Sequence, residues 1–280
     1  MTNPTVADEW LDWLARYARC GPLPKVRALH LPPLASAGSK NGEFCALELD
    51  DGAIGLSYVM LDGTLARLSE GAGVPPGASA LSLARGYLAA DPAQRAVGFA
   101  AINALTRSLF DRSGFVPEDS SDSIGELDPQ ADERIGMIGL FTPLVGRFID
   151  AGAQLTVLEL KPELQGAREG YRVTLDRREL AACEKILSTS TVLLNHTLDA
   201  VLTACTSARR FAMIGPGAGC LPDPLFARGV TSLGGSWVLD RQGFVEALRS
   251  GGAWGVHARK FTLHRDRYPG GAALLARLSG

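Results

Sequence analysis

Residues suited to chemistry follow a short apolar run at positions 211–214, which is flanked by breakers and predicts a buried strand. The next residues form an irregular loop in which glycines alternate with other types: Gly215, Pro216, Gly217, Ala218, Gly219 and Cys220. Glycine permits positive φ and lets a ligand approach the backbone closely. Gly215, Pro216 and Gly217 are therefore predicted to bind a ligand at the end of a strand. The alternative is a tight surface turn in which glycine has a steric role alone.

Cys220 is the candidate metal ligand of this loop, because a thiolate suits soft divalent transition metals. The alternative for its side chain is packing in the core. The four histidines of the chain show no His-x-x-x-His or His-Glu spacing. Local sequence therefore predicts no histidine metal site, and the identity of any metal stays open.

Three further polar segments follow predicted strands, at the edge where ligands of open parallel sheets bind. They supply the other candidate ligand-binding residues: Thr142, Glu159, Thr189, Ser190, Thr191 and Asn195. A helix N-cap is the more economical interpretation of the run Thr189, Ser190 and Thr191. Asn195 lies one turn into the predicted helix, within reach of a ligand at its start, whereas Asp199 fits a solvated face.

Glu159 stands about twenty residues past Gly139, the separation at which dinucleotide-binding folds often place a ribose-binding carboxylate. The glycines at 136, 139 and 146 nevertheless do not form Gly-x-Gly-x-x-Gly. The spacing supports an alternative function, an enzyme with a nucleotide-type cofactor such as S-adenosylmethionine or NAD. No nucleophile elbow, Walker loop or catalytic pair is present in the sequence, so no catalytic residue is predicted and enzymatic activity stays open.

The first part of the chain, residues 1–115, predicts an α+β domain. Apolar spacing indicates helices over 6–20, 79–89 and 92–110, and strands over 25–31, 44–49 and 54–61. The run Asp50-Asp51-Gly52 joins the last two strands as a hairpin turn. Residues 116–133 are rich in Ser, Asp, Glu and Pro and predict a linker, or a loop over a cleft.

From residue 134 to 280 strands alternate with helices, which predicts a Rossmann-like parallel sheet. The expected strands cover 135–141, 155–160, 185–188, 211–214, 237–239 and 260–264. The expected helices cover 143–151, 191–206 and 243–249. The fold class is therefore α/β, with an α+β N-terminal domain before the parallel sheet.

Composition excludes several classes of partner. The chain has 28 basic and 30 acidic residues and no long basic cluster, which argues against nucleic acid. Polar residues interrupt every apolar stretch before about 18 positions, and the acidic N-terminus lacks a signal-peptide pattern. We therefore expect a cytoplasmic protein without a membrane partner. Five widely spaced cysteines without a Cys-x-x-Cys pair favour reduced thiols.

Four segments, at residues 97–104, 136–143, 190–197 and 214–226, resemble in this order the family of uncharacterised proteins described as "putative heavy-metal chelation". The resemblance implies an enolase-N-terminal-like domain, a Rossmann-like domain and a site in the cleft between them. Asn103, Asn195, Gly215 and Pro216 match the family motifs, and the resemblance adds Asn103 to the candidate ligand-binding residues. His196 stands where a small residue is expected, so the resemblance assigns it no role.

Together these observations predict a protein that binds a small ligand between its two domains. The ligand is an anionic molecule, a heavy metal or a metal chelate. The nucleotide-dependent enzyme is the alternative function, and a purely structural module would leave the glycine loop without a role. A homo-oligomer stays open.

Overall fold

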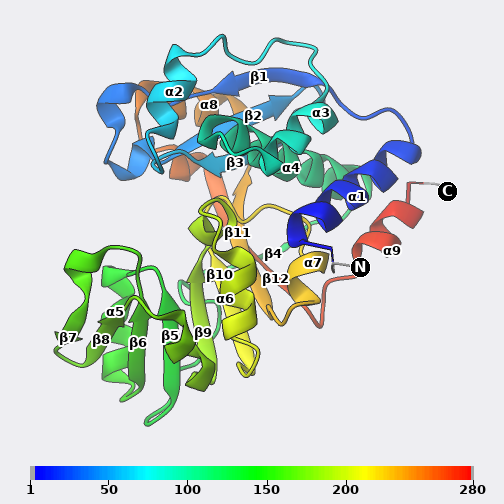
Figure 1. Cartoon of the computed structure of the whole chain (residues 1–280). Helices are drawn as coiled ribbons and strands as arrows, with labels where there is room; N and C mark the ends of the chain where they lie inside the picture. The colour runs from blue at the N-terminus through cyan, green and yellow to red at the C-terminus, as the bar shows by residue number, and fades with distance from the viewer. Residues whose placement is uncertain (1–3, 279–280) are drawn as a thin grey trace.

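The computed structural model describes residues 4–278 and contains two β-sheets (Figure 1). The small sheet is antiparallel and has the order β1 (Val26–His30), β2 (Phe44–Leu49), β3 (Ile54–Tyr58). We call this sheet with the helices of residues 4–115 the N-terminal unit, and residues 116–278 the C-terminal unit. The mixed α/β fold class predicted from the sequence is confirmed.

Helices surround both sheets. Those of the N-terminal unit are α1 (Val6–Arg19), η1 (Leu34–Ser36), η2 (Lys40–Gly42), α2 (Thr64–Glu70), α3 (Ala80–Ala84), η3 (Arg85–Leu88) and α4 (Pro92–Arg112). Those of the C-terminal unit are α5 (Thr142–Asp150), η4 (Pro162–Leu164), η5 (Arg177–Ala182), η6 (Ser190–Leu193), α6 (Leu198–Ala204), α7 (Asp223–Phe226), α8 (Arg241–Ser250), η7 (Trp254–His257) and α9 (Gly271–Ala276). Among the described residues, no helix combines the length and apolar character needed to cross a membrane.

Helix α4 is the centre of the N-terminal unit. Pro92 occupies its first turn and the Asp91 side chain caps it by accepting from the Gln94 N–H at 2.8 Å. Its small residues allow close packing, and a Cβ added to Gly55 of β3 would lie 2.2 Å from the carbonyl oxygen of Ala100. Side chains of α4 are buried on all sides, as expected of a helix enclosed by other elements.

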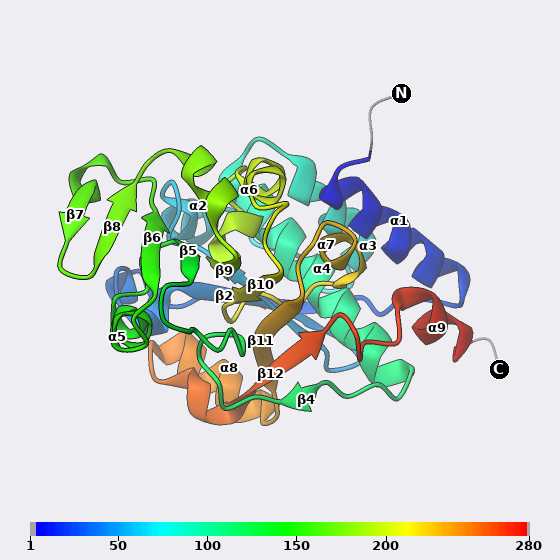
Figure 2. The ribbon, with the colours of Figure 1, turned by 90° about the horizontal axis from the view of Figure 1, so that it is seen from below.

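The hairpin predicted at residues 50–52 is confirmed, because β2 and β3 pair antiparallel on either side of that turn. Every residue of β2 is buried. One face of the small sheet packs in the same core as α4, and the other face lies against α8, which brings Phe244 and Leu248 onto Phe44 and Leu56. The small sheet is therefore covered by a helix from each unit (Figure 2).

The large sheet has nine strands in the order β4-β12-β11-β10-β9-β5-β6-β8-β7. Their bounds are β4 (Glu118–Asp119), β5 (Arg134–Ile138), β6 (Gln154–Leu158), β7 (Gly166–Arg168), β8 (Tyr171–Thr174), β9 (Lys185–Thr189), β10 (Arg210–Ile214), β11 (Ser232–Val238) and β12 (Ala258–His264). The strands from β8 to β11 are all parallel. Taken in chain order they are arranged 3-2-1-4-5-6, the order of dinucleotide-binding folds, with its reversal between β5 and β9.

One predicted helix is wrong: residues 191–206 form the short helices η6 and α6 with a turn between them. His196 has a φ of 61° in this turn, which ends the helical path. The Asn195 side chain accepts a hydrogen bond from the Thr197 N–H at 3.2 Å. Such a local bond offers the backbone an alternative to the helix, although the apolar spacing continues through it.

Residues 116–133 are packed against the large sheet and do not form a free linker. Strand β4 pairs with β12 at the sheet edge, and the side chains of Ile124 and Leu127 are buried in the core beside β5. These two apolar residues anchor a segment whose composition is otherwise polar. The domain boundary itself stays a prediction.

Candidate functional site

The glycine loop after β10 lies against the N-terminal unit. Asn103 Nδ2, on α4, donates hydrogen bonds to the carbonyl oxygens of Leu56 at 2.7 Å and Gly217 at 2.8 Å. The Asn103 side chain is buried, and its Oδ1 has no hydrogen-bond partner among the described residues. One amide therefore joins α4, β3 and the glycine loop. Asn103, predicted to bind a ligand, has its donor group engaged at this junction.

Gly215 is a position that requires glycine. Its φ is 149°, and a Cβ there would lie 2.1 Å from Ser190 Oγ. Gly217 has no such requirement, because its φ is not positive and a Cβ would meet the Phe44 ring at 3.7 Å, an ordinary contact. The structure thus brings Gly215 and Ser190 together, while Gly217 contributes its carbonyl oxygen to Asn103.

Cys220 lies entirely within the core, and burial raises the pKa of its thiol far above the usual range. A thiolate is the form that binds metal, so this environment opposes ligation. Among residues 4–278, no three His, Cys, Asp or Glu side chains are placed to hold one ion together. The side chains present therefore fit packing at Cys220 better than a metal centre built by the protein.

Iodoacetamide is expected to alkylate Cys20 alone in the native protein at pH 8, because the other four cysteines are buried. Burial raises the pKa of Cys183 to about 11 and those of Cys45 and Cys205 to about 12, and only the thiolate reacts. Peptide mapping by mass spectrometry, with and without guanidinium, measures the pattern. Native alkylation of Cys220 as fast as Cys20 would contradict its buried placement.

Glu159 directly follows β6 and binds the loop after β5. Its Oε1 accepts from the Leu140 N–H at 2.6 Å and its Oε2 accepts from the Leu160 N–H at 3.1 Å. The carboxylate is half-buried beside Gly139, which has a φ of 80°. Glu159 therefore lies next to the strand reversal, where a ribose-binding carboxylate would be. Both of its carboxylate oxygens, however, already accept hydrogen bonds from backbone N–H groups. Thr142 begins α5 and is exposed.

The hydroxyl-rich run after β9 acts as a cap. Thr189 Oγ1 accepts from the Thr191 N–H at 3.2 Å, and the two hydroxyl oxygens lie 2.9 Å apart, so the N-cap interpretation is confirmed. Ser190 is buried beside Gly215. Asn195 Oδ1 accepts from the Thr197 hydroxyl at 2.5 Å as well as from its N–H. Thr189 with Thr191, and Asn195 with Thr197, thus stabilise the loop through bonds to one another.

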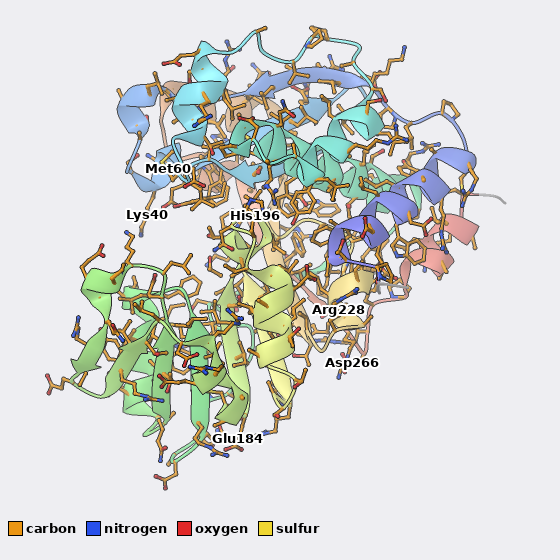
Figure 3. The ribbon with its side chains drawn as sticks, viewed as in Figure 1. Lys40, Met60, Glu184, His196, Arg228 and Asp266 are labelled. Carbon is orange, nitrogen blue, oxygen red and sulfur yellow. The ribbon has the colours of Figure 1, made fainter. Side chains whose placement is uncertain are left out.

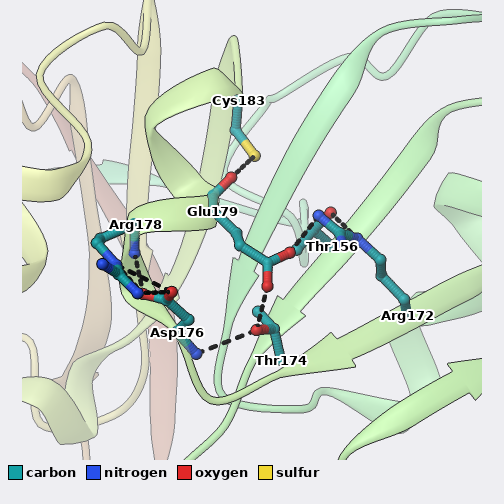
Figure 4. A network of polar contacts seen from close by, with 7 residues as sticks. All are labelled: Thr156, Arg172, Thr174, Asp176, Arg178, Glu179 and Cys183. Atoms are coloured by element: carbon teal, nitrogen blue, oxygen red, sulfur yellow. Dashed lines mark hydrogen bonds and ion pairs between the residues drawn. The ribbon is translucent and has the colours of Figure 1, made fainter.

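A polar cluster at the carboxyl end of β8 is likewise bonded within itself (Figure 4). Thr174 Oγ1 donates to Glu179 Oε1 at 2.7 Å, and Arg172 pairs with the same carboxylate. Asp176 caps η5 by accepting from the Arg178 N–H at 3.0 Å, and side-chain hydrogen bonds from Arg178 lower the pKa of Asp176 to about 2. This cluster fixes η5 on the sheet and is structural.

A cavity of about 160 Å³ lies beside η6, between the start of α4 and the turn that holds His196. Sequence reasoning missed its two arginines, Arg67 and Arg95, because no spacing relates them to the loops of the parallel sheet. Figure 3 shows His196 at the end of the C-terminal unit that faces α4. The family motifs gave no role to His196, yet this residue lines the cavity.

These features define a two-sheet α/β protein with a dinucleotide-type strand order and a loop edge facing a second unit. The chain belongs to the DUF364 family, described as "putative heavy-metal chelation", whose model matches residues 122–265. A second model with the same description, DUF4213, matches residues 42–106. The family resemblance of the sequence is confirmed. No curated protein matches this sequence.

Two solved structures share the fold, and both belong to proteins of the DUF364 family described as having unknown function. One from Desulfitobacterium hafniense has 18% identity and a TM-score of 0.67, covering 91% of this chain and 97% of its own. One from Pyrococcus horikoshii has 18% identity and a TM-score of 0.66, covering 92% of this chain and 98% of its own. At this identity the likeness concerns the fold alone.

Proposed function

We propose that the protein binds a small anionic ligand, in the form of a metal chelate, at the carboxyl edge of the parallel sheet. The strand order carries this proposal, because its reversal between β5 and β9 is where ligands of such sheets bind. The loops containing Gly139, Thr189 and Gly215 leave neighbouring strands at this edge. The adjoining N-terminal unit would form the other wall of the predicted cleft.

The chelate form follows from the available side chains. The family description concerns heavy metals, whereas a protein-built zinc site needs about three or four His, Cys or carboxylate ligands. The described residues offer no such group. A chelate brings its own donor atoms, and it requires from the protein only backbone N–H groups and a few polar contacts.

A nucleotide-type cofactor, S-adenosylmethionine or NAD, is the second candidate. Its support is the 3-2-1-4-5-6 strand order together with a carboxylate, Glu159, directly after the second of these strands. The hydrogen bond from Leu140 to Glu159 stands against it, because a ribose would have to compete for that oxygen.

In isothermal titration calorimetry we expect nickel–citrate to bind the wild-type protein saturably. Nickel chloride should show no saturable binding. Gly215→Ala should weaken the binding by about tenfold or more, roughly 1.4 kcal/mol, because the new methyl group forces the loop away from Ser190. Gly146→Ala is the matched control, since a Cβ there meets nothing within 4 Å.

Circular dichroism shows whether both variants are folded. Nickel chloride binding as tightly as nickel–citrate would show that the protein supplies the metal ligands itself and would contradict the proposal. Titrations with NAD and S-adenosylmethionine in the same instrument test the second candidate, which is abandoned if neither produces heat.

A further inference from the structure

The cavity beside η6 is lined by residues of both units. Tyr58 and Leu61 come from the end of β3 and the segment that follows it, Arg95 from α4, and Leu194 and His196 from the turn after η6. Its volume of about 160 Å³ is below the roughly 300–1,000 Å³ of pockets that hold drug-sized molecules. The space fits one compact chemical group with a short apolar extension, but not a nucleotide.

Arg95 is the cation of this cavity without a carboxylate partner. Its Nη2 donates to the Ala89 carbonyl oxygen at 2.6 Å, while its Nε is buried with no hydrogen-bond partner among the described residues. The guanidinium lies 5.8 Å from the centroid of the Tyr87 ring. Among residues 4–278 no ion pair of Arg95 with Asp or Glu is formed. The side chain is half-buried as a whole, so its remaining guanidinium N–H groups can donate to an acceptor that enters the cavity.

The two carboxylates near the cavity do not pair with Arg95 in the described residues. Arg67 lies on its rim and pairs with Asp91 at 3.6 Å, a long and largely exposed contact. Asp62 also lines the cavity and is exposed. Exposed pairs of this kind contribute little, so the Arg67 guanidinium can turn to a second acceptor at small cost.

We infer that this cavity binds the oxyanion group, a carboxylate or a phosphate, of a small molecule. Arg95 contacts the oxyanion, because its planar fork matches two oxygens at once. Arg67 approaches from the rim, and His196 closes the side formed by the C-terminal unit. The inference rests on the proposed function in one respect: the group bound here is the anionic end of the same ligand.

Inorganic phosphate and succinate are the probes, each titrated into the wild-type protein at low ionic strength in isothermal titration calorimetry. Saturable binding of at least one is expected, and the tighter of the two identifies the oxyanion as phosphoryl or carboxylate. Arg95→Met should weaken the binding of the tighter probe about tenfold or more. Arg95→Lys keeps the charge but loses the planar fork, so its affinity should lie between those of wild type and Arg95→Met. His196→Asn, which tolerates positive φ, should weaken it severalfold.

Arg16→Met is the control, since Arg16 lies on α1 away from the cavity and its loss makes the same change in net charge. Circular dichroism and thermal melts show whether Arg95→Met is folded, and Arg95→Lys carries the test if it is not. No saturable binding to wild type, or equal weakening by Arg16→Met and Arg95→Met, overturns the inference.

The inference and the proposed function can fail separately. Wild-type protein that binds phosphate or succinate through Arg95 but does not bind nickel–citrate keeps the oxyanion cavity and loses the metal chelate. If wild type and Arg95→Met bind nickel–citrate equally well and wild type binds neither phosphate nor succinate, the metal chelate is kept and the oxyanion cavity is lost.

Discussion

Asn103→Leu is expected to lower the free energy of unfolding by roughly 2–4 kcal/mol. The Asn103 amide donates to two buried carbonyl oxygens, of Leu56 and Gly217, and each acceptor left without a donor costs about 1–3 kcal/mol. Removing Oδ1, which is buried without a partner, offsets part of this loss. Urea denaturation followed by circular dichroism measures the change.

Two further substitutions show whether the amide donor is the cause. Asn103→Asp should be more destabilising than Asn103→Leu, because a buried carboxylate would face the same two carbonyl oxygens without donating to them. Asn195→Ala removes an amide of similar size from a half-buried turn and should cost about 1 kcal/mol or less. A cost below about 1 kcal/mol for Asn103→Leu would mean that the two units do not depend on this bond.

Much of the fold could be predicted from the sequence because its signals are local. The run at residues 50–52 has turn chemistry, and apolar runs separated by helical spacing after residue 134 predict parallel strands. The prediction of one helix over residues 191–206 was wrong because the hydrogen bond to the Asn195 side chain competes with helical backbone bonds. Hydrophobic spacing carries no information on such a side-chain bond. Residues 116–133 pack on the large sheet because two buried side chains outweigh a polar composition, a contact that composition does not predict.

The candidate site was less predictable, because its parts come from distant positions in the chain. Glycine at 215 could be assigned a special conformation from its loop, and Thr189 a cap, since both depend on near neighbours. The engagement of Asn103 by the glycine loop depends on how the two units pack. The same holds for Arg95 and His196, which are about a hundred positions apart and share one cavity. Composition carries no signal for such contacts.

Gly55→Ala is expected to destabilise the protein by about 3 kcal/mol or more, because it inserts a methyl group where β3 touches α4. The added Cβ would lie 2.2 Å from both the carbonyl oxygen of Ala100 and the backbone nitrogen of Ala104. Neither atom can rotate away, since both belong to the backbone of a helix, so β3 must move as a whole. That shift would also draw the Leu56 carbonyl away from Asn103.

Chemical denaturation gives the size of the effect, and amide hydrogen exchange shows where it is. Protection should fall in β3 and in the glycine loop around Gly217 together, because Asn103 connects them. Gly146→Ala, in α5 with open space around the new methyl group, should be neutral or stabilise by up to about 1 kcal/mol. If Gly55→Ala changed the free energy of unfolding as little as Gly146→Ala, the close approach of β3 to α4 would be wrong. The position of the Leu56 carbonyl, on which the junction between the two units depends, would then be wrong as well.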